Sequence, residues 1–567
     1  MRKILEVTDL KDMLNKTREL YGDKPGYKIR IGEGKYKIYT HNEIRDMINY
    51  LGTELINLGL KGKKIAVIGE NRYEWEIAYL AVACGTGIIV PLDRSLPPNE
   101  LEELIERSEV EAIFYSKKYE EAIKQIRFSE KNKLKHLISM DTDVHDEGIY
   151  SEKELIEKGK ELVDGGNRDF IDAKINPDEM NIMLFTSGTT SKSKVVALSH
   201  KNLVSNVMDS ASVIDVDSSD KVLSFLPLHH VFECTVGMLL SLYLGAERSF
   251  CDGIRHILEN INEYNITFSS FVPAIYESMY KNIMKTLEKQ GKLEAVKKLM
   301  VENRDKTMAE KKEIFKDIHN IFGGNVKMFI SGAAALDKDV EQAFRDWGIN
   351  LCQGYGLTET SPVIGVETNE NFRVGSIGKP LPHVQARIDD ANEEGMGELV
   401  VKGPNVMLGY YGDEEATKEV MEKDGWFHTG DLAKIDEDGY IYICGRKKSV
   451  IVLKNGKNIF PEEMEALVNK VEGVKESFIF GKQQSDDKED IKINVKIVFD
   501  RDIMKEAYKV DTDEEIRKVL SDKIKEINKI MPKYKAIRGM IISEEPLIKT
   551  TTNKIKRQAN LEKIQNK

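Results

Sequence analysis

The chain has 567 residues, more than one hydrophobic core normally serves, so we expect more than one domain. With 41% hydrophobic and 32% charged residues, its composition is that of an ordinary globular protein. A formal net charge of -11 argues against the basic footprint of a nucleic-acid-binding protein, and we expect no nucleic-acid partner. The five cysteines are scattered without metal-ligand spacing, which predicts reduced and mostly buried thiols.

The amino-terminal segment shows no targeting pattern. Residues 1–16 carry charges throughout and have no apolar centre, so they do not read as a signal peptide. The most apolar run, 234–246, is too short to span a bilayer. We therefore expect a cytoplasmic protein, with a peripheral position at the inner face of a membrane left open.

The first clear structural pattern is a strand–helix–strand unit in residues 64–92. An apolar run that ends in Gly69 precedes a segment of helical period, and a second apolar run, 88–90, follows. This order predicts two parallel strands with a right-handed crossover. Similar alternation continues to about residue 440, which predicts an α/β fold with helices on both faces of the sheets. Residues 116–178 carry no motif, and we expect helices and loops at the surface there.

A strand-like run, 180–185, leads into a loop that is rich in hydroxyls. The loop reads TSGTTSKSK and contains one glycine and two lysines. Backbone N–H groups and hydroxyls can donate to phosphate oxygens while a lysine adds positive charge, although the spacing is not that of a Walker A loop. A polar linker is the alternative interpretation. The candidate phosphate ligands are Thr186, Ser187, Gly188, Thr189, Thr190 and Lys194.

The central motif of the chain has the sequence QGYGLTET. Gly354 and Gly356 let the backbone bend tightly and approach a ligand closely. Tyr355, between them, offers a flat face on which a nucleobase can stack. Thr358 and Glu359 supply hard oxygen atoms of the kind that Mg²⁺ prefers when it is shared with phosphate oxygens. A loop between a strand and a helix, without any ligand, is the alternative.

QGYGLTET resembles a core motif of the adenylate-forming superfamily, which includes acyl-CoA synthetases, peptide-synthetase adenylation domains and firefly-type luciferases. Other motifs of that family follow in its order from about residue 60 to the end of the chain. The resemblance implies ATP as substrate, Mg²⁺ held through Glu359, and CoA as co-substrate. The TSGTTSKSK loop is similar to the family's phosphate loop, but Ser191 and Val195 replace glycines and Ser193 replaces proline. These departures predict a stiffer loop.

Two further site elements are implied by the same resemblance. In the stretch PLHHVF, His230 matches the residue that borders the carboxylate pocket. The apolar helix behind it, 235–244, is expected to be core that also lines one side of an acyl tunnel. Small residues after the strand 326–330 match an adenine shelf opposite Tyr355, and a tight turn without a ligand is the alternative there. The shelf residues are Ser331, Gly332 and Ala333.

The ribose side of the expected site comes from two later motifs. Asp431, in the stretch WFHTGD, matches the residue that accepts both ribose hydroxyls, a role that suits the two oxygens of a carboxylate. Arg446 matches a second contact near the ribose and phosphates and offers a planar fork of donors. The character of the sequence then changes. We expect an ATP- and acid-binding domain, 1–446, and a small mobile α+β domain, 447–567.

The small domain carries the residues that the resemblance connects with movement. Lys448 matches the hinge, and Gly456 lies in a loop expected to face the active site while the thioester forms. Lys554, near the C-terminus, matches the catalytic lysine. Lys549 and Lys556 are the alternatives if this register is wrong.

The implied reaction has two halves. A carboxylate attacks the α-phosphorus of ATP and pyrophosphate leaves, while Lys554 and Mg²⁺ offset the negative charge that accumulates. The thiolate of CoA then attacks the acyl-adenylate and AMP leaves, after the small domain has turned about Lys448. The resemblance thus implies a catalytic set of Lys554, Glu359, Thr358 and His230.

The acid is the least constrained part of the prediction. A charged helical stretch, 279–321, resembles an insertion of long-chain fatty-acyl-CoA synthetases and favours a medium- or long-chain fatty acid. Its lysines are most simply a solvated face, and contact with anionic lipid headgroups is the alternative. An acyl-carrier-protein acceptor, an aryl or amino acid, and a ligand-binding relative without turnover also stay open. Amino-acid activators of this family usually have an aspartate near residues 227–233. The chain has Glu233 there and no convincing aspartate, which argues against an amino acid as the substrate.

Overall fold

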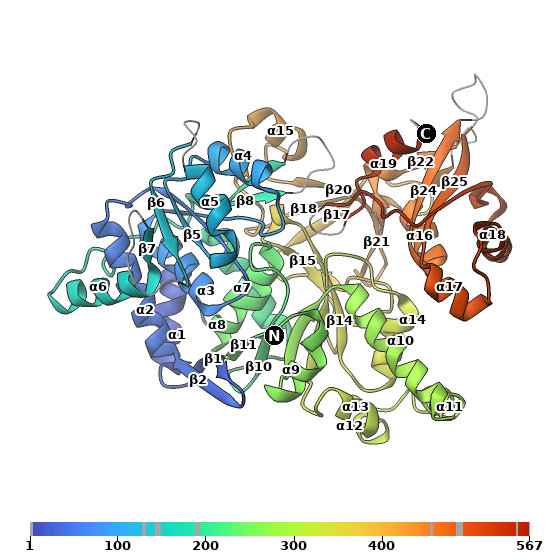
Figure 1. Ribbon diagram of the computed structural model, residues 1–567, viewed down its shortest axis with the longest axis horizontal. Coiled ribbons are helices and arrows are strands. Elements are labelled where there is room, and N and C mark those ends of the chain that lie inside the picture. Colours follow the sequence, from blue (N-terminus) through green and yellow to red (C-terminus); the bar gives the residue numbers. More distant parts are fainter. Residues whose placement is uncertain are drawn as a thin grey trace.

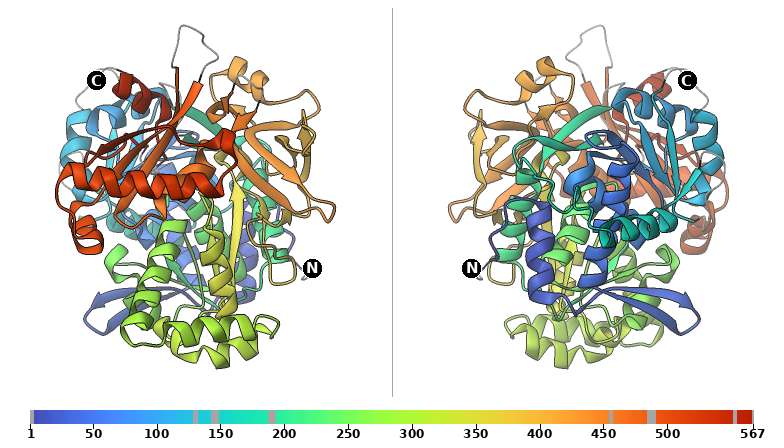
Figure 2. Two further views of the ribbon diagram at one scale, coloured as in Figure 1. Left: turned by 90° about the vertical axis from the view of Figure 1, so that its right-hand side faces the viewer. Right: turned by 90° about the vertical axis from the view of Figure 1, so that its left-hand side faces the viewer.

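The computed structural model has the α/β architecture that the alternating pattern predicts, with a large N-terminal body and a smaller C-terminal body at one end of it (Figures 1 and 2). The N-terminus lies on the large body and the C-terminus on the small one. The structure describes residues 4–127, 132–141, 149–186, 193–453, 457–483, 491–550 and 554–565.

An eight-stranded sheet forms the first half of the large body. Its strands, in spatial order, are β19 (Gly409–Tyr410), β9 (Lys194–Ser199), β8 (Met180–Thr186), β4 (Ile88–Pro91), β3 (Lys64–Ile68), β5 (Ala112–Tyr115), β6 (His136–Ser139) and β7 (Ile149–Ser151). β3 and β4 pair in parallel and α3 (Tyr73–Ala81) lies between them in the chain, which confirms the predicted strand–helix–strand unit.

The segment 116–178 contributes more than the expected surface helices and loops. β6 pairs in parallel with β5, and β7 pairs in parallel with β6, so two strands of this segment extend the sheet. The expectation was wrong because each strand offers only two consecutive apolar or aromatic residues, Leu137-Ile138 and Ile149-Tyr150, and these are next to polar residues. Leu137 and Ile138 of β6 are nevertheless completely buried.

A nine-stranded sheet forms the second half of the large body. Its strands, in spatial order, are β16 (Lys379–Pro380), β15 (Val363–Val366), β14 (Leu351–Gly356), β13 (Met328–Ser331), β12 (Phe268–Phe271), β10 (Lys221–Ser224), β11 (Glu247–Phe250), β1 (Pro25–Gly32) and β2 (Lys35–Thr40). The six strands from β14 to β1 pair in parallel with one another, whereas β15 and β2 pair antiparallel at the two ends of this run. The expected adenine shelf and the QGYG motif therefore lie side by side at the carboxyl ends of β13 and β14.

Helices pack between the two sheets and around them. One hydrophobic cluster joins both sheets through α7 (His200–Val213), the π-helical η3 (Glu233–Leu239) and α8 (Leu240–Leu244). The predicted apolar helix 235–244 is therefore present, as η3 continued by α8, and it is buried. The other helices of the large body are α1 (Leu10–Tyr21), α2 (His41–Asn57), α4 (Pro98–Ser108), α5 (Glu120–Arg127), α6 (Glu152–Asp164), α9 (Ile257–Glu263), α14 (Lys338–Asp346) and α15 (Glu414–Val420).

The charged stretch after residue 279 is helical, as predicted, and forms one margin of the large body (Figure 1). Val296 and Met300 pack against a second hydrophobic cluster. The lysines of α10 and α11 are exposed, as a solvated face predicts, but Lys311 of α12 is buried. The stretch consists of α10 (Pro273–Lys289), α11 (Leu293–Glu302), α12 (Met308–Ile314) and α13 (Lys316–Ile321).

A four-stranded antiparallel sheet completes the large body and extends toward the small one. Its last two strands pair Asp431 directly opposite Arg446, so the two expected ribose contacts become neighbours. The sheet consists of β17 (Gln385–Asp389), β18 (Gly397–Lys402), β20 (Phe427–Ile435) and β21 (Ile441–Arg446).

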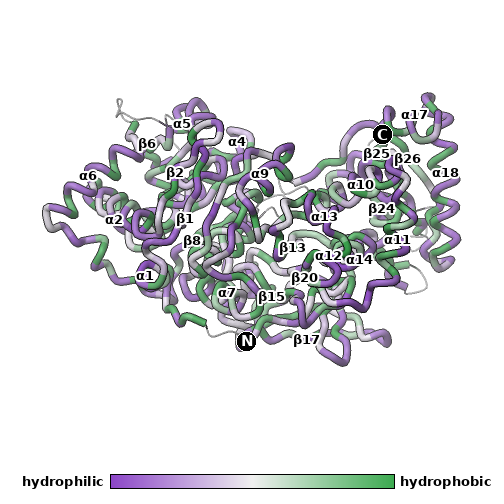
Figure 3. Tube along the Cα trace, turned by 90° about the horizontal axis from the view of Figure 1, so that it is seen from below, coloured by the Kyte–Doolittle hydropathy of each residue, from purple (hydrophilic) through white to green (hydrophobic). Residues whose placement is uncertain are grey.

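The small body has its own sheet and its own hydrophobic cluster. In α18 (Asp513–Ile530) the buried residues Ile516, Leu520, Ile524 and Ile527 follow a helical period, so that one face packs on the sheet. Hydrophobic and hydrophilic positions alternate along this helix in Figure 3. The remaining elements are β22 (Ile451–Val452), β23 (Asn458–Ile459), β24 (Val474–Gln483), β25 (Ile491–Phe499), β26 (Gly539–Ser543), α16 (Pro461–Asn469), α17 (Arg501–Tyr508) and α19 (Arg557–Gln565).

Candidate active site

A cavity of about 3520 Å³ is lined by residues of both large sheets, of the four-stranded sheet and of the small body. Most of the expected site residues that the structure describes line it: Thr186, Lys194, His230, Gly332, Ala333, Gly354, Tyr355, Gly356, Thr358, Glu359, Asp431, Arg446, Lys448 and Lys554. Ser331 does not line the cavity, because its side chain is buried within the sheet at the end of β13. Ser187, Gly188, Thr189, Thr190 and Gly456 lie outside the described residues.

The ends of the expected phosphate loop are held by antiparallel pairing. Thr186 closes β8 and pairs with Lys194, which opens β9. Val195, which we counted as a loop residue, is in fact a buried strand residue that packs in a hydrophobic cluster. Its substitution for glycine therefore stabilises the strand and does not stiffen the loop.

The two glycines of the QGYG motif differ in how much space surrounds them. A Cβ at Gly356 would lie 1.8 Å from the carbonyl oxygen of Pro362, so only glycine fits where β14 meets β15. Gly354 has ordinary space around it, with nothing closer than 3.7 Å to such a Cβ. Gly332, on the expected adenine shelf, is restricted by a side chain, because a Cβ there would lie 2.8 Å from the ring of Phe232.

Asp431 is the centre of the ribose side. Arg446 Nε lies 2.7 Å from one carboxylate oxygen, and the Tyr355 hydroxyl donates to the other. Burial raises the pKa of Asp431, and the charge of Arg446 and the Tyr355 hydrogen bond counteract this. Both oxygens are thus engaged by donors of the protein, and a pair of ribose hydroxyls can exchange with these donors at the same oxygens.

Glu359 lies at the other side of the cavity, in the short 3₁₀ turn η5 (Thr358–Thr360). The hydroxyl of Tyr410 donates to its Oε1 at 3.0 Å, and the N–H of Met407 donates to its carbonyl at 2.8 Å. One carboxylate beside a threonine hydroxyl fits Mg²⁺, which keeps several waters and takes its other ligands from substrate phosphates. The donor set therefore suits a metal that arrives with a nucleotide.

Lys554 enters the cavity from the small body. It keeps contact with solvent inside the cavity, but the surrounding protein atoms lower its pKa. The positive charge of Arg446 lowers the pKa further, while Asp431 and Glu359 raise it. The ammonium group therefore lies within electrostatic reach of both sides of the site.

The two alternative lysines differ from Lys554 in their surroundings. Lys549 forms an ion pair with Glu476 inside the small body and does not line the cavity. Lys556 does line the cavity, so the structure alone does not separate it from Lys554. Lys448 is exposed at the junction of the two bodies, next to Lys447, which binds Glu398 at 2.7 Å.

His230 lies at the apolar end of the site beside His229, with ring centroids 4.1 Å apart. Burial, followed by the neighbouring His229, lowers the pKa of His230 to about 3, so the ring is neutral at neutral pH. His229 Nε2 lies 3.4 Å from Asp93, a residue that sequence reasoning missed. The available signal was the position of Asp93, a carboxylate just beyond the carboxyl end of β4.

An apolar wall continues the cavity beyond His230. Val236 and Leu240, one helical turn apart on η3 and α8, belong to it, as the tunnel interpretation expects. The lining is apolar on several elements, including Ile214, Val231, Phe232, Phe268, Val272 and Val363. Such a wall can bury a hydrocarbon chain whose polar end lies near His230 and Lys554.

Gln353, the first residue of the motif, supports the turn that follows β13. Its Oε1 accepts from the N–H of Leu336 at 3.1 Å, and its Nε2 donates to Glu341 at 3.1 Å. Glu341 and Glu367 are both completely buried, and burial followed by the charge of Glu341 raises the pKa of Glu367 to about 9. Sequence reasoning missed this pair, because its members lie far apart in the chain.

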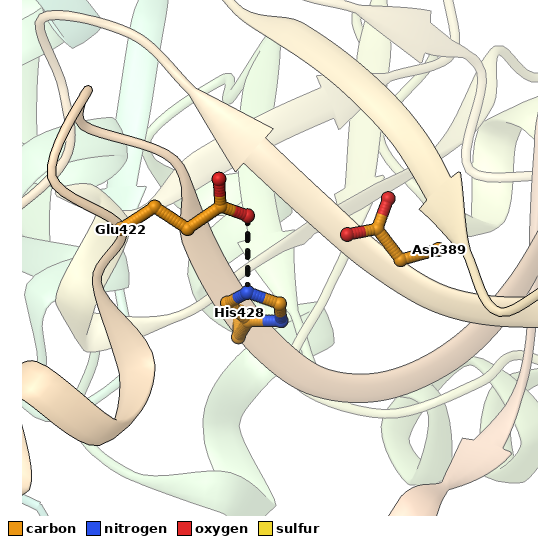
Figure 4. Close-up of side chains that lie close together, drawn as sticks. All are labelled: Asp389, Glu422 and His428. Atoms are coloured by element: carbon orange, nitrogen blue, oxygen red, sulfur yellow. Dashed lines mark hydrogen bonds and ion pairs between the residues drawn. The ribbon is translucent and has the colours of Figure 1, made fainter.

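A second group of ionisable side chains lies beside the TGD stretch, where Asp389, Glu422 and His428 approach one another (Figure 4). His428 Nε2 is 3.2 Å from Glu422, and its Nδ1 is 3.3 Å from Glu398. Arg387 binds Asp389 at 2.8 Å and also Glu422. The guanidinium therefore already neutralises both carboxylates, and we assign the group to an ion-pair network and not to a metal.

Comparisons with known proteins agree with this geometry. A model of the AMP-binding enzyme family matches residues 16–411, and a model of the AMP-binding enzyme C-terminal domain matches residues 448–567. The chain is 29% identical over 489 residues to the peroxisomal long chain acyl-CoA synthetase 6 of Arabidopsis thaliana, covering 80% of this chain and 68% of the relative. It is also 29% identical over 495 residues to the long-chain-fatty-acid–CoA ligase 6 of Mus musculus, covering 81% and 70%.

Solved structures share the fold over nearly the whole length. ATP-bound MatB from Rhodopseudomonas palustris superimposes with a TM-score of 0.75 at 24% identity, covering 99% of both chains. The anthranilate CoA ligase AuaEII, in complex with anthranoyl-AMP, gives a TM-score of 0.77 at 19% identity, covering 98% of this chain and 97% of the other. At these identities the likeness shows a shared fold.

Proposed function

The chain belongs to the AMP-binding enzyme family, and on that premise we propose that it is an AMP-forming fatty-acid–CoA ligase. It activates a long-chain fatty acid with ATP and then transfers the acyl group to CoA. The observation that carries this proposal is the meeting of Glu359, Asp431, Arg446 and Lys554 in one cavity with an apolar wall. The curated relatives named above are long-chain acyl-CoA synthetases and ligases, which supports the same class of acid.

In the first half-reaction an oxygen of the fatty-acid carboxylate forms a bond to the α-phosphorus of ATP, and the bond to pyrophosphate breaks. Glu359 would hold Mg²⁺ together with the nucleotide, and the ion would supply positive charge to the phosphates and the leaving group. Asp431 and Arg446 hold the ribose side, and Lys554 balances the charge of the two anions that meet. No general base is required, because the carboxylate is already ionised at neutral pH.

The neutral His230 has a different role from Lys554. Its lowered pKa keeps the imidazole uncharged, so it orients the carboxyl group as a hydrogen-bonding partner and adds no positive charge. The hydrocarbon chain extends along the apolar wall that includes Val236 and Leu240. The division places charge neutralisation at one end of the acid and hydrophobic burial at the other.

In the second half-reaction the sulfur of CoA forms a bond to the acyl carbon, and the bond between that carbon and AMP breaks. Lys554 enters the cavity from the small body, so it has to withdraw before the thiol can reach the acyl-adenylate. A rotation of residues 447–567 about Lys448 would accomplish this. The separate hydrophobic clusters of the two bodies support such a division at 446/447, which stays a proposal.

The proposal is tested by pyrophosphate release from ATP and Mg²⁺ over a series of acids from acetate to oleate, with benzoate and amino acids included. Each acid is tested with and without CoA, and each with Lys554→Ala beside the natural chain. Release with long-chain acids that increases with CoA and collapses in the variant is the expected result. Release that ignores CoA would instead indicate a carrier-protein acceptor, and no release with any acid would refute an enzymatic role.

We also propose a peripheral contact between α11 and an anionic membrane surface. No helix among the described residues is long and apolar enough to cross a membrane. On α11, Val301 is 66% exposed and shares a helical face with Lys297 and Lys298. An apolar side chain beside lysines suits an anionic lipid surface. Cosedimentation with phosphatidylglycerol vesicles but not phosphatidylcholine vesicles, lost in Val301→Ser/Lys298→Glu, is expected; equal binding to both would contradict it.

A further inference from the structure

Tyr410 lies between the two groups that the proposed reaction assigns to metal and phosphate. Its hydroxyl donates to Glu359 Oε1 at 3.0 Å. The ammonium group of Lys194 lies 4.3 Å from the centroid of its ring. The residue lines the cavity and is only 8% exposed.

The backbone around Tyr410 is attached to both neighbours. β19 pairs antiparallel with β9, so that Tyr410 lies opposite Val196, two residues beyond Lys194. The N–H of Met407 donates to the Glu359 carbonyl at 2.8 Å, and the side chain of Asn405 donates to the Thr360 carbonyl at 2.9 Å. The strand, the loop end and the motif therefore form one connected unit.

We propose that Tyr410 is a positioning residue for the metal and phosphate groups of this site. The inference rests on the proposed function, because it takes Glu359 as the metal-binding carboxylate and Lys194 as a phosphate-binding ammonium. A hydrogen bond to one carboxylate oxygen fixes the rotation of the carboxylate, so the second oxygen keeps a defined direction toward a cation. The ring attracts the ammonium group and holds it over the same part of the cavity.

The hydroxyl and the ring can be tested separately. Tyr410→Phe removes the hydroxyl and keeps the ring, while Tyr410→Leu removes both. The matched control is Tyr411→Phe, because Tyr411 is 38% exposed, binds Lys64 at 2.9 Å and does not line the cavity. All variants are compared as full-length chains.

The first measurement is the binding of Mn²⁺ in the presence of ATP and the absence of any acid, followed by electron paramagnetic resonance. We expect Tyr410→Phe to weaken Mn²⁺ binding about tenfold, the lower end of the effect of losing a partner of a metal ligand. Tyr411→Phe should bind like the natural chain. Unchanged Mn²⁺ binding in Tyr410→Phe would overturn the role of the hydroxyl.

The second measurement separates the two half-reactions. Tyr410→Phe should raise the Mg²⁺ concentration needed for half-maximal pyrophosphate release, while transfer from a supplied acyl-adenylate to CoA stays unchanged. Tyr410→Leu should additionally weaken ATP binding, measured by calorimetry, because the ammonium of Lys194 loses its partner. Equal losses in both half-reactions, together with a lower melting temperature, would show a purely structural role. If the natural chain activates no acid, the proposed function fails, and Mn²⁺ binding still tests Tyr410.

Discussion

The ribose side of the cavity and the lysine that faces it are held in different ways. Asp431 has Arg446 as its partner on the adjacent strand and Tyr355 on β14, so three elements of the large body fix it. Lys554 belongs to the small body and reaches the same place across the junction of the two. The ribose side of the candidate site is thus held within the large body, whereas Lys554 is contributed by the small body.

The contacts at the junction agree with that difference. Lys470, in the small body, lies 2.7 Å from Asp337 and 2.9 Å from Asp339 of the large body. The side chains of Lys470 and Asp339 are 47% and 79% exposed, and that of Asp337 is 18% exposed, so water reaches the lysine and one of its two partners. Ion pairs that water reaches contribute about 0–1 kcal/mol, so Lys470 favours this position of the small body only weakly.

The largest effect is expected from replacing Lys554, the positive charge that the small body contributes to the cavity. Lys554→Ala should lower the rate of acyl-adenylate formation by about 10²–10³-fold, the usual cost of removing one charge-stabilising donor. Transfer of a supplied acyl-adenylate to CoA should change little, because Lys554 is withdrawn in that step. Both rates are measured by quenched flow. Lys549→Ala, whose lysine pairs with Glu476, is the control, and a greater loss there would show that the register is wrong.

The ribose side of the candidate site is tested by the substitution Asp431→Asn. An amide cannot accept from Arg446 and Tyr355 as a carboxylate does, and it leaves the guanidinium without a counter-ion. We expect ATP binding to weaken by about 1–3 kcal/mol, roughly 5-fold to 150-fold, measured by calorimetry. Asp438→Asn, whose carboxylate binds Arg373 at the turn between β20 and β21 and does not line the cavity, should bind ATP normally. Equal affinity in the two variants would argue against a ribose contact at Asp431.

The buried carboxyl pair, Glu341 and Glu367, gives a prediction for how the stability of the protein depends on pH. Glu341 Oε1 has no hydrogen-bond partner among the described residues, as expected if a proton shared with Glu367 lies between them. Gln353, Gly375 and Arg373 donate to the pair, and none of them fills that position.

The folded pair therefore keeps a proton that the unfolded chain releases near its ordinary pKa. Stability is fully present below about pH 4.5 and declines as the pH rises toward the folded pKa of Glu367, about 9. The slope is about 1.4 kcal/mol per pH unit. Glu367→Gln should flatten the dependence of the melting temperature on pH over this range, because its amide replaces the shared proton. Glu370→Gln, an exposed neighbour, should keep the slope; a flat profile in the natural chain would contradict the shared proton.

The smallest effect is expected at the junction. Lys470→Gln should lower the rate of acyl-adenylate formation at most about fivefold, which corresponds to about 1 kcal/mol. The reason is that the ion pairs of Lys470 with Asp337 and Asp339, which join the small body to the large one, are lost. The thioester half-reaction should be unchanged or faster. Lys475→Gln removes an ion pair with Asp500 inside the small body and is the matched control. Slower thioester formation in Lys470→Gln would show that the pair serves both positions.

Local patterns predicted the fold class, and the family resemblance predicted most residues of the candidate site. The parallel unit formed by β3 and β4 was predictable because a helix of ordinary length separates two apolar runs. The strands β6 and β7 were not predictable, because their apolar runs are only two residues long and lie next to polar residues. Val195 was misplaced for a related reason: the strand begins inside what the family motif treats as loop.

Chemistry that depends on one short stretch was thus visible in the sequence alone. Glycines, hydroxyls and carboxylates within a few residues of one another, as in QGYGLTET, indicate a phosphate or nucleotide site because the backbone itself brings them together. The resemblance then assigned roles to Asp431, Arg446 and Lys554, which the tertiary structure collects in one cavity.

Only the tertiary structure decided which distant side chains support that chemistry. Tyr410 meets Glu359 across 51 residues of chain, and Gln353 meets Leu336 across 17. Asp93 reaches His229 because the carboxyl end of β4 faces the cavity, as do the elements that follow β10. A hydrogen bond or an ion pair depends on distances of about 3 Å, and such distances between remote residues are set by how the sheets and the two bodies pack, which no local pattern records.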